Sequence, residues 1–223
     1  PADIRDDIAI LAGGGYGRGE LFPHSDIDLL VLARRPAAHK ASISAFLHCL
    51  FDLKVEIGHS VRSPRECRRE AERDLTVATA MFERRLLVGS RKLAAELDKQ
   101  MDSPRLWPAD RFFKAKRDEQ ALRHRQYDNE EYGLEPNLKT SPGGLRDIQT
   151  AMWVMARQFR TTDLAALERL GMLTAEERSW LEDGRRFLWW VRFGLHLLAG
   201  RKEDHLQFQY QRALSQRLGF ADT

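Results

Sequence analysis

Two aspartates, Asp26 and Asp28, stand two positions apart where an apolar run over residues 27–33 begins. Alternate residues of a β-strand project from the same face, so these carboxylates would lie side by side, roughly 6.5 Å apart along the chain. Like charges at that spacing repel each other and resist burial unless a cation lies between them. Their oxygens suit Mg²⁺, with Mn²⁺ as an alternative, and two such ions can hold the attacking and leaving oxygens of a phosphoryl-type displacement. The pair therefore indicates metal-dependent phosphoryl chemistry.

A third carboxylate is expected on a neighbouring strand. Residues 53–57 alternate between apolar and charged side chains, the pattern of a half-buried strand. Glu56 occupies one of the charged positions, and we predict that it completes the acidic site. Asp52 would lie on the same face of such a strand and is the second choice for the third carboxylate.

A glycine-rich segment, GGGYGRG over residues 13–19, separates the apolar run Ile8–Ala12 from the aspartates. Glycines directly after a strand let backbone N–H groups approach phosphates. A P-loop is excluded because Glu20 and Leu21 follow where Lys and Ser or Thr are needed. The dinucleotide-binding GxGxxG fingerprint fits in no register. What is left is a Gly-Gly pair that ends eleven residues before Asp26.

Each signal alone has a simpler interpretation. A glycine-rich turn is more often only a tight turn, and an Asp-x-Asp pair can be a solvated edge or a pair of calcium ligands. Their combination at this spacing, with a later strand carboxylate, favours a site for a metal and a nucleotide.

The elements that must position these residues fall into two parts. The first sixty residues alternate strand and helix signals, and from Ser63 onward the signals are helical, with capping boxes at residues 63–66 and 174–177. The expected class is α+β, with a small mixed β-sheet and helices over residues 1–90, followed by an all-helical domain over residues 91–223. Expected helices cover residues 38–51, 75–87, 92–101, 110–127, 145–159, 174–198 and 211–218, with a loop over 135–144.

Composition limits the partners. The chain has 223 residues with 36 Lys and Arg against 33 Asp and Glu, a net charge of +3, which is too small to favour nucleic acid or an anionic membrane. Its apolar runs are too short to span a bilayer. Cys49 and Cys67 form no CxxC motif, which excludes a disulfide scaffold and a structural zinc site, so a cytoplasmic setting is expected. The start at Pro1 suggests a piece of a longer protein.

The Gly-Gly, Asp-x-Asp and later acidic strand together resemble the DNA polymerase β-like nucleotidyltransferase superfamily. Within it, the string GGYGRGELFPHSDIDLL over residues 14–30 is similar to the bifunctional uridylyltransferase/uridylyl-removing enzymes of bacterial nitrogen signalling. Residues 54–62, 74–79 and 137–149 support the narrower resemblance across essentially the whole chain. The segment SPGGLRDIQ over residues 141–149 is the most discriminating, because the general superfamily lacks it.

The resemblance implies transfer of UMP from UTP to a tyrosine hydroxyl of a PII signal protein, with release of pyrophosphate. By the same resemblance, Asp26 and Asp28 would hold two metal ions, and Glu56 would complete the site and help to deprotonate the incoming hydroxyl. The backbone of Gly14 and Gly15 would reach the triphosphate. Ser25 would add a hydroxyl contact.

Four further side chains are candidates for nucleotide binding. Arg18 lies in the glycine segment, and its planar fork suits phosphate oxygens, although a surface arginine is the simpler interpretation. Asn137, Lys139 and Arg146 lie in or beside a Gly/Pro loop that opens a helix, an arrangement that favours anions. An ordinary linker is the alternative for that loop.

One departure from the family pattern and two rival functions complete the expectations. The sequence has no His-Asp dipeptide of the kind that marks the family's hydrolase domain. We therefore expect this chain to lack the uridylyl-removing activity and glutamine sensing. The rivals are adenylyl or other nucleotidyl transfer to another protein or small molecule, and a catalytically silent nucleotide-binding or PII-docking module. The presence of all three carboxylates disfavours the silent module.

Overall fold

The computed structural model divides the chain into two compact units. The first combines Pro1–Leu21 with Ser25–Pro108, and the second combines Phe22–His24 with Ala109–Thr223. The expected division near residue 90 falls inside the first unit, because the helix that follows residue 90 packs against the strands of that unit. The structure describes residues 4–53, 56–127 and 133–220.

The first unit is built around a mixed sheet, as the sequence predicts, and the sheet has four strands. Its strands are β1 (Ile8–Ala12), β2 (Ile27–Ala33), β3 (Ile57–Arg62) and β4 (Arg85–Gly89), in the order β3-β2-β1-β4. Strand β1 is antiparallel to both β2 and β4, whereas β2 and β3 run parallel. Strands β2 and β1 are therefore the central strands, and β2 carries Asp28.

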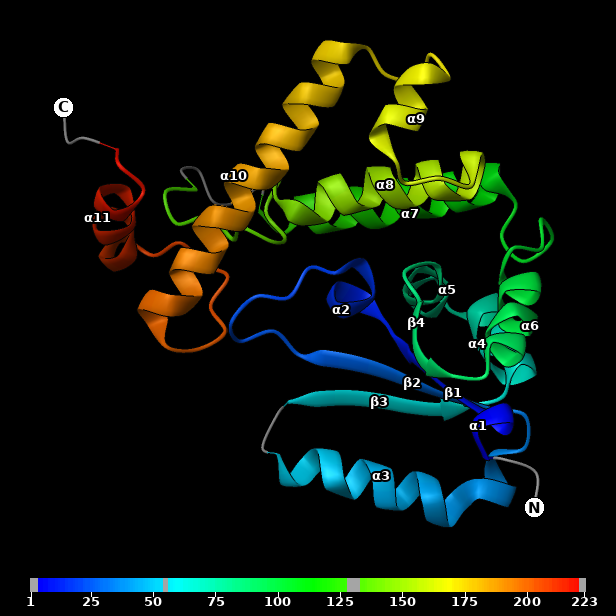
Figure 1. Cartoon of the computed structure of the whole chain (residues 1–223). Helices are drawn as coiled ribbons and strands as arrows, with labels where there is room; N and C mark the ends of the chain where they lie inside the picture. The colour runs from blue at the N-terminus through cyan, green and yellow to red at the C-terminus, as the bar shows by residue number, and fades with distance from the viewer. Residues whose placement is uncertain (1–3, 54–55, 128–132, 221–223) are drawn as a thin grey trace. The chain divides into compact units, whose positions relative to one another are not determined.

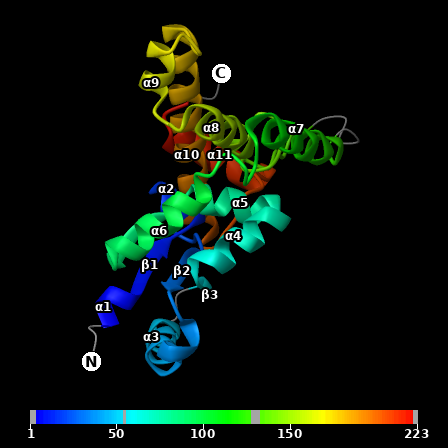
Figure 2. The same ribbon diagram turned by 90° about the vertical axis from the view of Figure 1, so that its right-hand side faces the viewer.

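Helix α3 (Lys40–Asp52) covers one face of this sheet. Val31 and Ala33 of β2 form a buried cluster with Ile43 and Leu47 of α3. Figures 1 and 2 both show α3 on one side of the sheet and the helices of residues 64–101 on the other. Because side chains alternate along a strand, the even-numbered residues of β2 point away from α3.

The remaining helices of the first unit are short. Ser63 and Glu66 form the predicted capping box at the start of α4, since the Ser63 side chain accepts from Glu66 N and the Glu66 carboxylate accepts from Ser63 N. The remaining elements are α1 (Ile4–Asp7), α2 (Gly14–Arg18), η1 (Pro36–His39), α4 (Pro64–Arg73), α5 (Leu75–Phe82) and α6 (Arg91–Met101).

Two sequence-based assignments in this unit are wrong. The helix expected over residues 75–87 ends at Phe82, and the chain then forms strand β4. The strand expected over residues 53–57 begins only at Ile57 and continues to Arg62, because α3 still includes Asp52 and Leu53 lies in a turn. Residues 54–55 of that assignment lie outside the described part of the chain. Asp52 therefore lies in a helix, and the argument that it shares a strand face with Glu56 is wrong.

The second unit is helical, as predicted. Figure 1 shows α7 and α8 side by side, and the capping box at Thr174 and Glu177 opens α10. Leu138, Val191, Leu195 and Leu214 form a buried cluster that joins α10 and α11 to the loop before α8. Its helices are α7 (Ala109–Arg125), α8 (Leu145–Phe159), α9 (Leu164–Arg169), α10 (Ala175–Ala199) and α11 (Phe208–Arg217).

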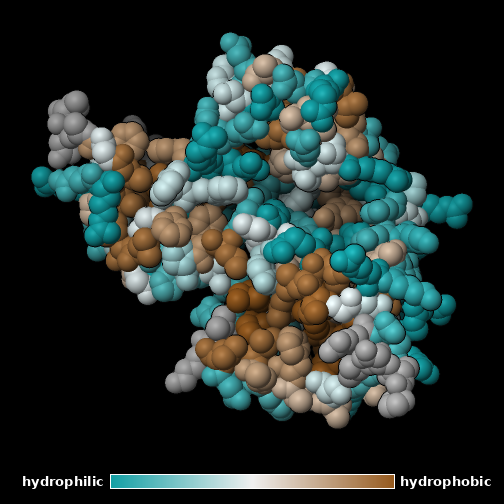
Figure 3. Space-filling model, in the orientation of Figure 1, coloured by the Kyte–Doolittle hydropathy of each residue, from teal (hydrophilic) through white to brown (hydrophobic). Residues whose placement is uncertain are grey.

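Apolar side chains also reach the surface. Figure 3 shows them gathered where α3 lies on the sheet and, in the second unit, over α10 and α11. Phe187, Trp190 and Phe208 are among the exposed side chains on these two helices. Within the described residues, no helix is both long enough and apolar enough to cross a membrane.

Candidate active site

The register of β2 and β3 fixes which strand position lies beside Asp28. Asp28 pairs with Gly58, and Ile27 N donates to Glu56 O at 3.0 Å, so the pairing extends to the residue before β3. Val61 of β3 packs against the cluster under α3, and strand alternation then sends Gly58 to the opposite face with Asp28. Asp26 and Glu56 each lie one residue before these strands, and their place on that face stays a prediction.

These carboxylates fit a hard cation only in part. Asp28 and Glu56 are exposed and Asp26 is half-buried. Over the described ranges, no three acidic, histidine or cysteine side chains lie close enough together to hold a metal ion. Mg²⁺ nevertheless uses few protein carboxylates and completes its shell with water and substrate oxygens. Asp26 and Asp28 have the oxygen donors for such a site, and Glu56 as the third ligand stays a prediction.

Two glycines make room for the Asp28 carboxylate. A Cβ atom at Gly14 would lie 2.5 Å from Asp28 Oδ2, and one at Gly58 would lie 2.7 Å from Asp28 Oδ1. Gly14 also has a φ of +49°, a conformation that other residues rarely adopt. Gly13 N donates to Asp28 O at 2.9 Å and fixes the turn against β2. The missing Cβ atoms of Gly14 and Gly58 thus leave the space that the carboxylate occupies.

The glycine segment forms a tight helical turn, α2, instead of the open loop that the sequence suggests. A Cβ atom at Gly15 would lie 3.0 Å from Glu20 O, and Gly15 O accepts from Glu20 N at 2.7 Å. The first N–H groups of a helix have no acceptor one turn before them, so those of Gly14 and Gly15 have the geometry to donate to a ligand. Ser25 is half-buried beside Asp26.

Arg18 is engaged by two carboxylates of the same unit. Its Nε lies 2.7 Å from Glu20 Oε2, and its Nη1 pairs with Glu83 Oε1. Burial alone would lower the pKa of Arg18, but the charges of Glu83 and Glu20 outweigh it and raise the pKa. These pairs join the glycine turn to the end of α5, which is a structural role. Contact with a triphosphate stays a prediction.

In the second unit, Asn137 builds the turn that carries the other candidates. Its Oδ1 accepts from Lys139 N at 3.0 Å and from Thr140 N at 2.9 Å. Its own N–H donates to Ser141 Oγ at 2.8 Å. The Asn137 side-chain oxygen is therefore occupied by the turn itself.

Lys139, in the turn before α8, is joined through its backbone to Arg146 in the first turn of α8. Arg146 N donates to Lys139 O at 2.8 Å, and the Arg146 guanidinium lies 5.1 Å from the ring centre of Trp153. Burial lowers the pKa of Lys139, and the positive charge of Arg146 lowers it further. Two cations held this close favour an anionic ligand.

Asp147 organises the same loop, a role that the sequence did not single out. It accepts from Gln120 Nε2 and from Gly143 N, each at 2.8 Å, and it pairs with Arg123 and His124. Burial alone would raise the pKa of Asp147, but these hydrogen bonds outweigh it and hold the pKa below its ordinary value. Its position in the first turn of α8 was the available signal.

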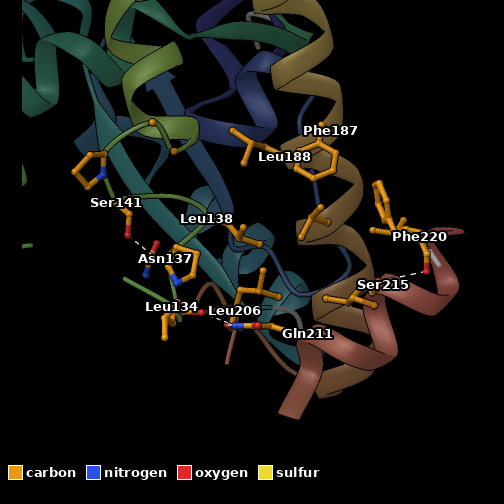
Figure 4. A pocket seen from close by; sticks show the side chains of 17 residues that line it. Leu134, Asn137, Leu138, Ser141, Phe187, Leu188, Leu206, Gln211, Ser215 and Phe220 are labelled. Atoms are coloured by element: carbon orange, nitrogen blue, oxygen red, sulfur yellow. Dashed lines mark hydrogen bonds between the residues drawn. The ribbon is translucent and has the colours of Figure 1, made fainter. Parts of the chain in front are cut away.

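A cavity of about 460 Å³ opens beside this loop within the second unit. Figure 4 shows Leu138, Leu188 and Leu206 directed into it, with Phe187 and Phe220 at its edge. Asn137 and Ser141 line the cavity, whereas Lys139 and Arg146 do not. This lining is mostly apolar and lacks the positive charge that a triphosphate requires.

Comparisons with known proteins decide between the families that such a site allows. The profile of the GlnD PII-uridylyltransferase family matches residues 111–223, and that of the nucleotidyltransferase domain matches residues 2–87. The chain belongs to the GlnD PII-uridylyltransferase family. Its sheet unit therefore carries the nucleotidyltransferase part of that family, and the resemblance drawn from the sequence is confirmed.

Curated relatives of this family cover nearly the whole chain. Bifunctional uridylyltransferase/uridylyl-removing enzymes from Stutzerimonas stutzeri (strain A1501) and Azotobacter vinelandii (strain DJ / ATCC BAA-1303) are each 48% identical over 219 residues, 97% of this chain. The enzyme of the same name from Pseudomonas fluorescens (strain SBW25) is 50% identical over 217 residues, 96% of this chain. The chain spans 24% of the length of each of these relatives.

Proposed function

We propose that this chain transfers UMP from UTP to a tyrosine hydroxyl of a PII signal protein in the cytoplasm, with release of pyrophosphate. The observation that carries the proposal is the Asp28 carboxylate, which lies in space that Cβ atoms at Gly14 and Gly58 would fill. Family membership supports UTP as donor and a PII protein as acceptor.

The proposed roles follow from the chemistry of each group. Asp26 and Asp28, with Glu56, would hold divalent metal, Mg²⁺ or Mn²⁺, which when bound neutralises charge on the phosphate oxygens. Glu56 is exposed and would accept the proton of the incoming tyrosine hydroxyl. The backbone N–H groups of Gly14 and Gly15 would orient the triphosphate, with Ser25 as a further donor.

Arg18, Lys139 and Arg146 are each candidates to contact the polyphosphate. Lys139 and Arg146 are the stronger candidates, since they lie together at the start of α8. Arg18 would have to share its guanidinium with Glu20 and Glu83. Nucleotidyl transfer depends mainly on positioning and charge stabilisation, so each of these groups would contribute without forming a covalent intermediate.

A comparison of nucleotide donors, with a PII protein as the acceptor, tests the proposal. The chain is incubated with Mg²⁺, a PII protein and UTP labelled in the α-phosphate, and parallel reactions contain ATP, CTP or GTP. We expect label on the PII protein from UTP only. Preferred transfer from ATP would support the adenylyl-transfer rival, and binding of UTP without transfer from any nucleotide would support the silent module.

A further inference from the structure

A buried charged centre lies in the second unit, where Arg192 and His196 of α10 meet Asp204 of the stretch that joins α10 to α11. The Asp204 carboxylate accepts from Arg192 Nε at 2.7 Å, and His196 Nε2 lies 3.5 Å from the same oxygen. The side chains of Arg192 and His196 are 8% and 0% exposed, and that of Asp204 is 16% exposed. The proposed function gives these three residues no role.

The backbone around Asp204 pairs with the loop that carries Lys139. Leu138 N donates to Asp204 O at 2.8 Å, and Leu206 N donates to Pro136 O at 2.9 Å. Between these two bonds, Asn137 and His205 form an antiparallel bridge. Lys139 is the next residue after this short ladder, so the place of its backbone depends on the place of residues 204–206.

Positive charge exceeds negative charge around Lys139. Arg146, Arg192 and Lys202 act on the Lys139 ammonium with like charge, and Asp204 acts on it with opposite charge. Burial lowers the pKa of Lys139 and weakens solvent screening there, so the neighbouring cations repel one another more strongly than they would in water. A bound phosphate chain would relieve that repulsion.

We propose that Asp204 is a positioning residue, which anchors residues 204–206 to Arg192 and so sets Lys139 beside Arg146 as a binding site for the polyphosphate of a nucleotide. This inference rests on the proposed function and deepens it, because it names a residue that acts through Lys139 without touching the substrate. The ion pair between Asp204 and Arg192 is mostly buried, and loss of one partner would leave the other charge without its match.

Two roles for Asp204 predict changes of opposite sign. If Asp204 acted only through its charge, then its neutralisation would make the site more positive, and an anion would bind more tightly. If Asp204 positions Lys139, then its neutralisation loosens the ladder, and the anion binds more weakly.

The test measures binding of inorganic tripolyphosphate to the whole chain by calorimetry, in EDTA, so that no metal ion contributes. We expect Asp204→Asn to weaken binding about tenfold, as a small misplacement of one binding group does. The control is Asp183→Asn on α10, whose carboxylate is 62% exposed and pairs with Arg186. It should bind tripolyphosphate like the unmodified chain. Equal or tighter binding by Asp204→Asn would overturn the positioning role.

A second variant keeps the test decisive if Asp204→Asn does not fold. Arg192→Lys keeps a cation beside Asp204 but removes the Nε–carboxylate hydrogen bond, and we expect it to weaken tripolyphosphate binding as well. If Asp204→Asn does not fold and Arg192→Lys binds normally, the inference is wrong. No tripolyphosphate binding by the unmodified chain would also overturn it. UMP transfer is assayed separately, so an inactive chain with the expected binding pattern would refute the proposed function alone.

Discussion

Asp28 and Gly58 face each other across the parallel strands β2 and β3, and a Cβ atom at position 58 would lie 2.7 Å from Asp28 Oδ1. Gly14 sets the same limit on the other carboxylate oxygen. Two glycines from separate segments of the chain therefore leave the space that the Asp28 carboxylate occupies.

Substitution Gly58→Ala should impair transfer while leaving the fold intact. Gly58 is exposed and its φ is ordinary, so a methyl group meets the Asp28 carboxylate but not the core. A displacement of this kind costs about a hundredfold in kcat/KM. Steady-state kinetics and thermal unfolding measure the two effects. The control, Gly184→Ala, adds a methyl group in open space on α10; it should leave the kinetics unchanged and raise the unfolding temperature slightly, because alanine favours a helix more than glycine does. Full activity of Gly58→Ala would show that the carboxylate can move freely.

Substitution Arg18→Gln should lower stability. Glu83 is 6% exposed at its side chain and would lose its cationic partner, which costs about 1–3 kcal/mol in free energy of unfolding. Urea denaturation measures the loss. Arg34→Gln is the control, because Arg34 is 47% exposed and its pair with Glu96 contributes little. If Arg18→Gln unfolds like the unmodified chain but has a higher KM for UTP, then Arg18 serves the nucleotide instead of the turn.

Substitution Asp147→Asn should destabilise the second unit in a pH-dependent way. The asparagine amide would present N–H donors to groups that already donate, and the expected loss is about 1–3 kcal/mol at pH 7. The pKa of Asp147 is lowered in the folded chain, so its stabilisation is present above its ordinary pKa of 3.8 and is lost as the pH falls through the lower folded value.

Thermal unfolding at pH 7 and at pH 3 tests that dependence. The difference between Asp147→Asn and the unmodified chain should be smaller at pH 3. A difference that grows with acidity would contradict the assigned direction of the pKa shift. Asp118→Asn, an exposed change on α7, should have little effect at either pH.

Removal of divalent metal should abolish transfer without unfolding the chain. Asp28 is exposed and Asp26 is half-buried, and the core of the sheet unit is apolar, so we expect the fold not to depend on a cation. EDTA should therefore stop labelling of the PII protein and leave the circular dichroism spectrum unchanged, and added Mg²⁺ or Mn²⁺ should restore labelling. Persistent transfer in EDTA would refute the metal-dependent mechanism.

Local patterns predicted much of this fold. The capping boxes at Ser63 and Thr174 begin helices as expected, and the helix over residues 145–159 has the predicted bounds. These features depend on neighbouring residues, which a sequence displays directly. The run before Gly89 was assigned to a helix because a short apolar run does not distinguish helix from strand. Its pairing with β1 is a contact that no local pattern contains.

The site was predictable only in the part that local spacing encodes. Asp26 and Asp28 were chosen as candidates from their spacing alone, whereas the steric role of Gly58 depends on which strand pairs with β2. The pairing of Asp204 with Arg192, and of residues 136–138 with 204–206, likewise joins segments that the sequence keeps apart. The function of a side chain in such a contact can be assigned only once the structure shows which segments pair.

The most direct test is mass analysis of a PII protein after incubation with UTP, Mg²⁺ and this chain, with Asp28→Asn in parallel. The unmodified chain should add one uridylyl group to a tyrosine of the PII protein, and Asp28→Asn should reduce the rate by about 100-fold or more while its unfolding temperature stays the same. An unmodified PII protein, or equal modification by Asp28→Asn, would contradict the account.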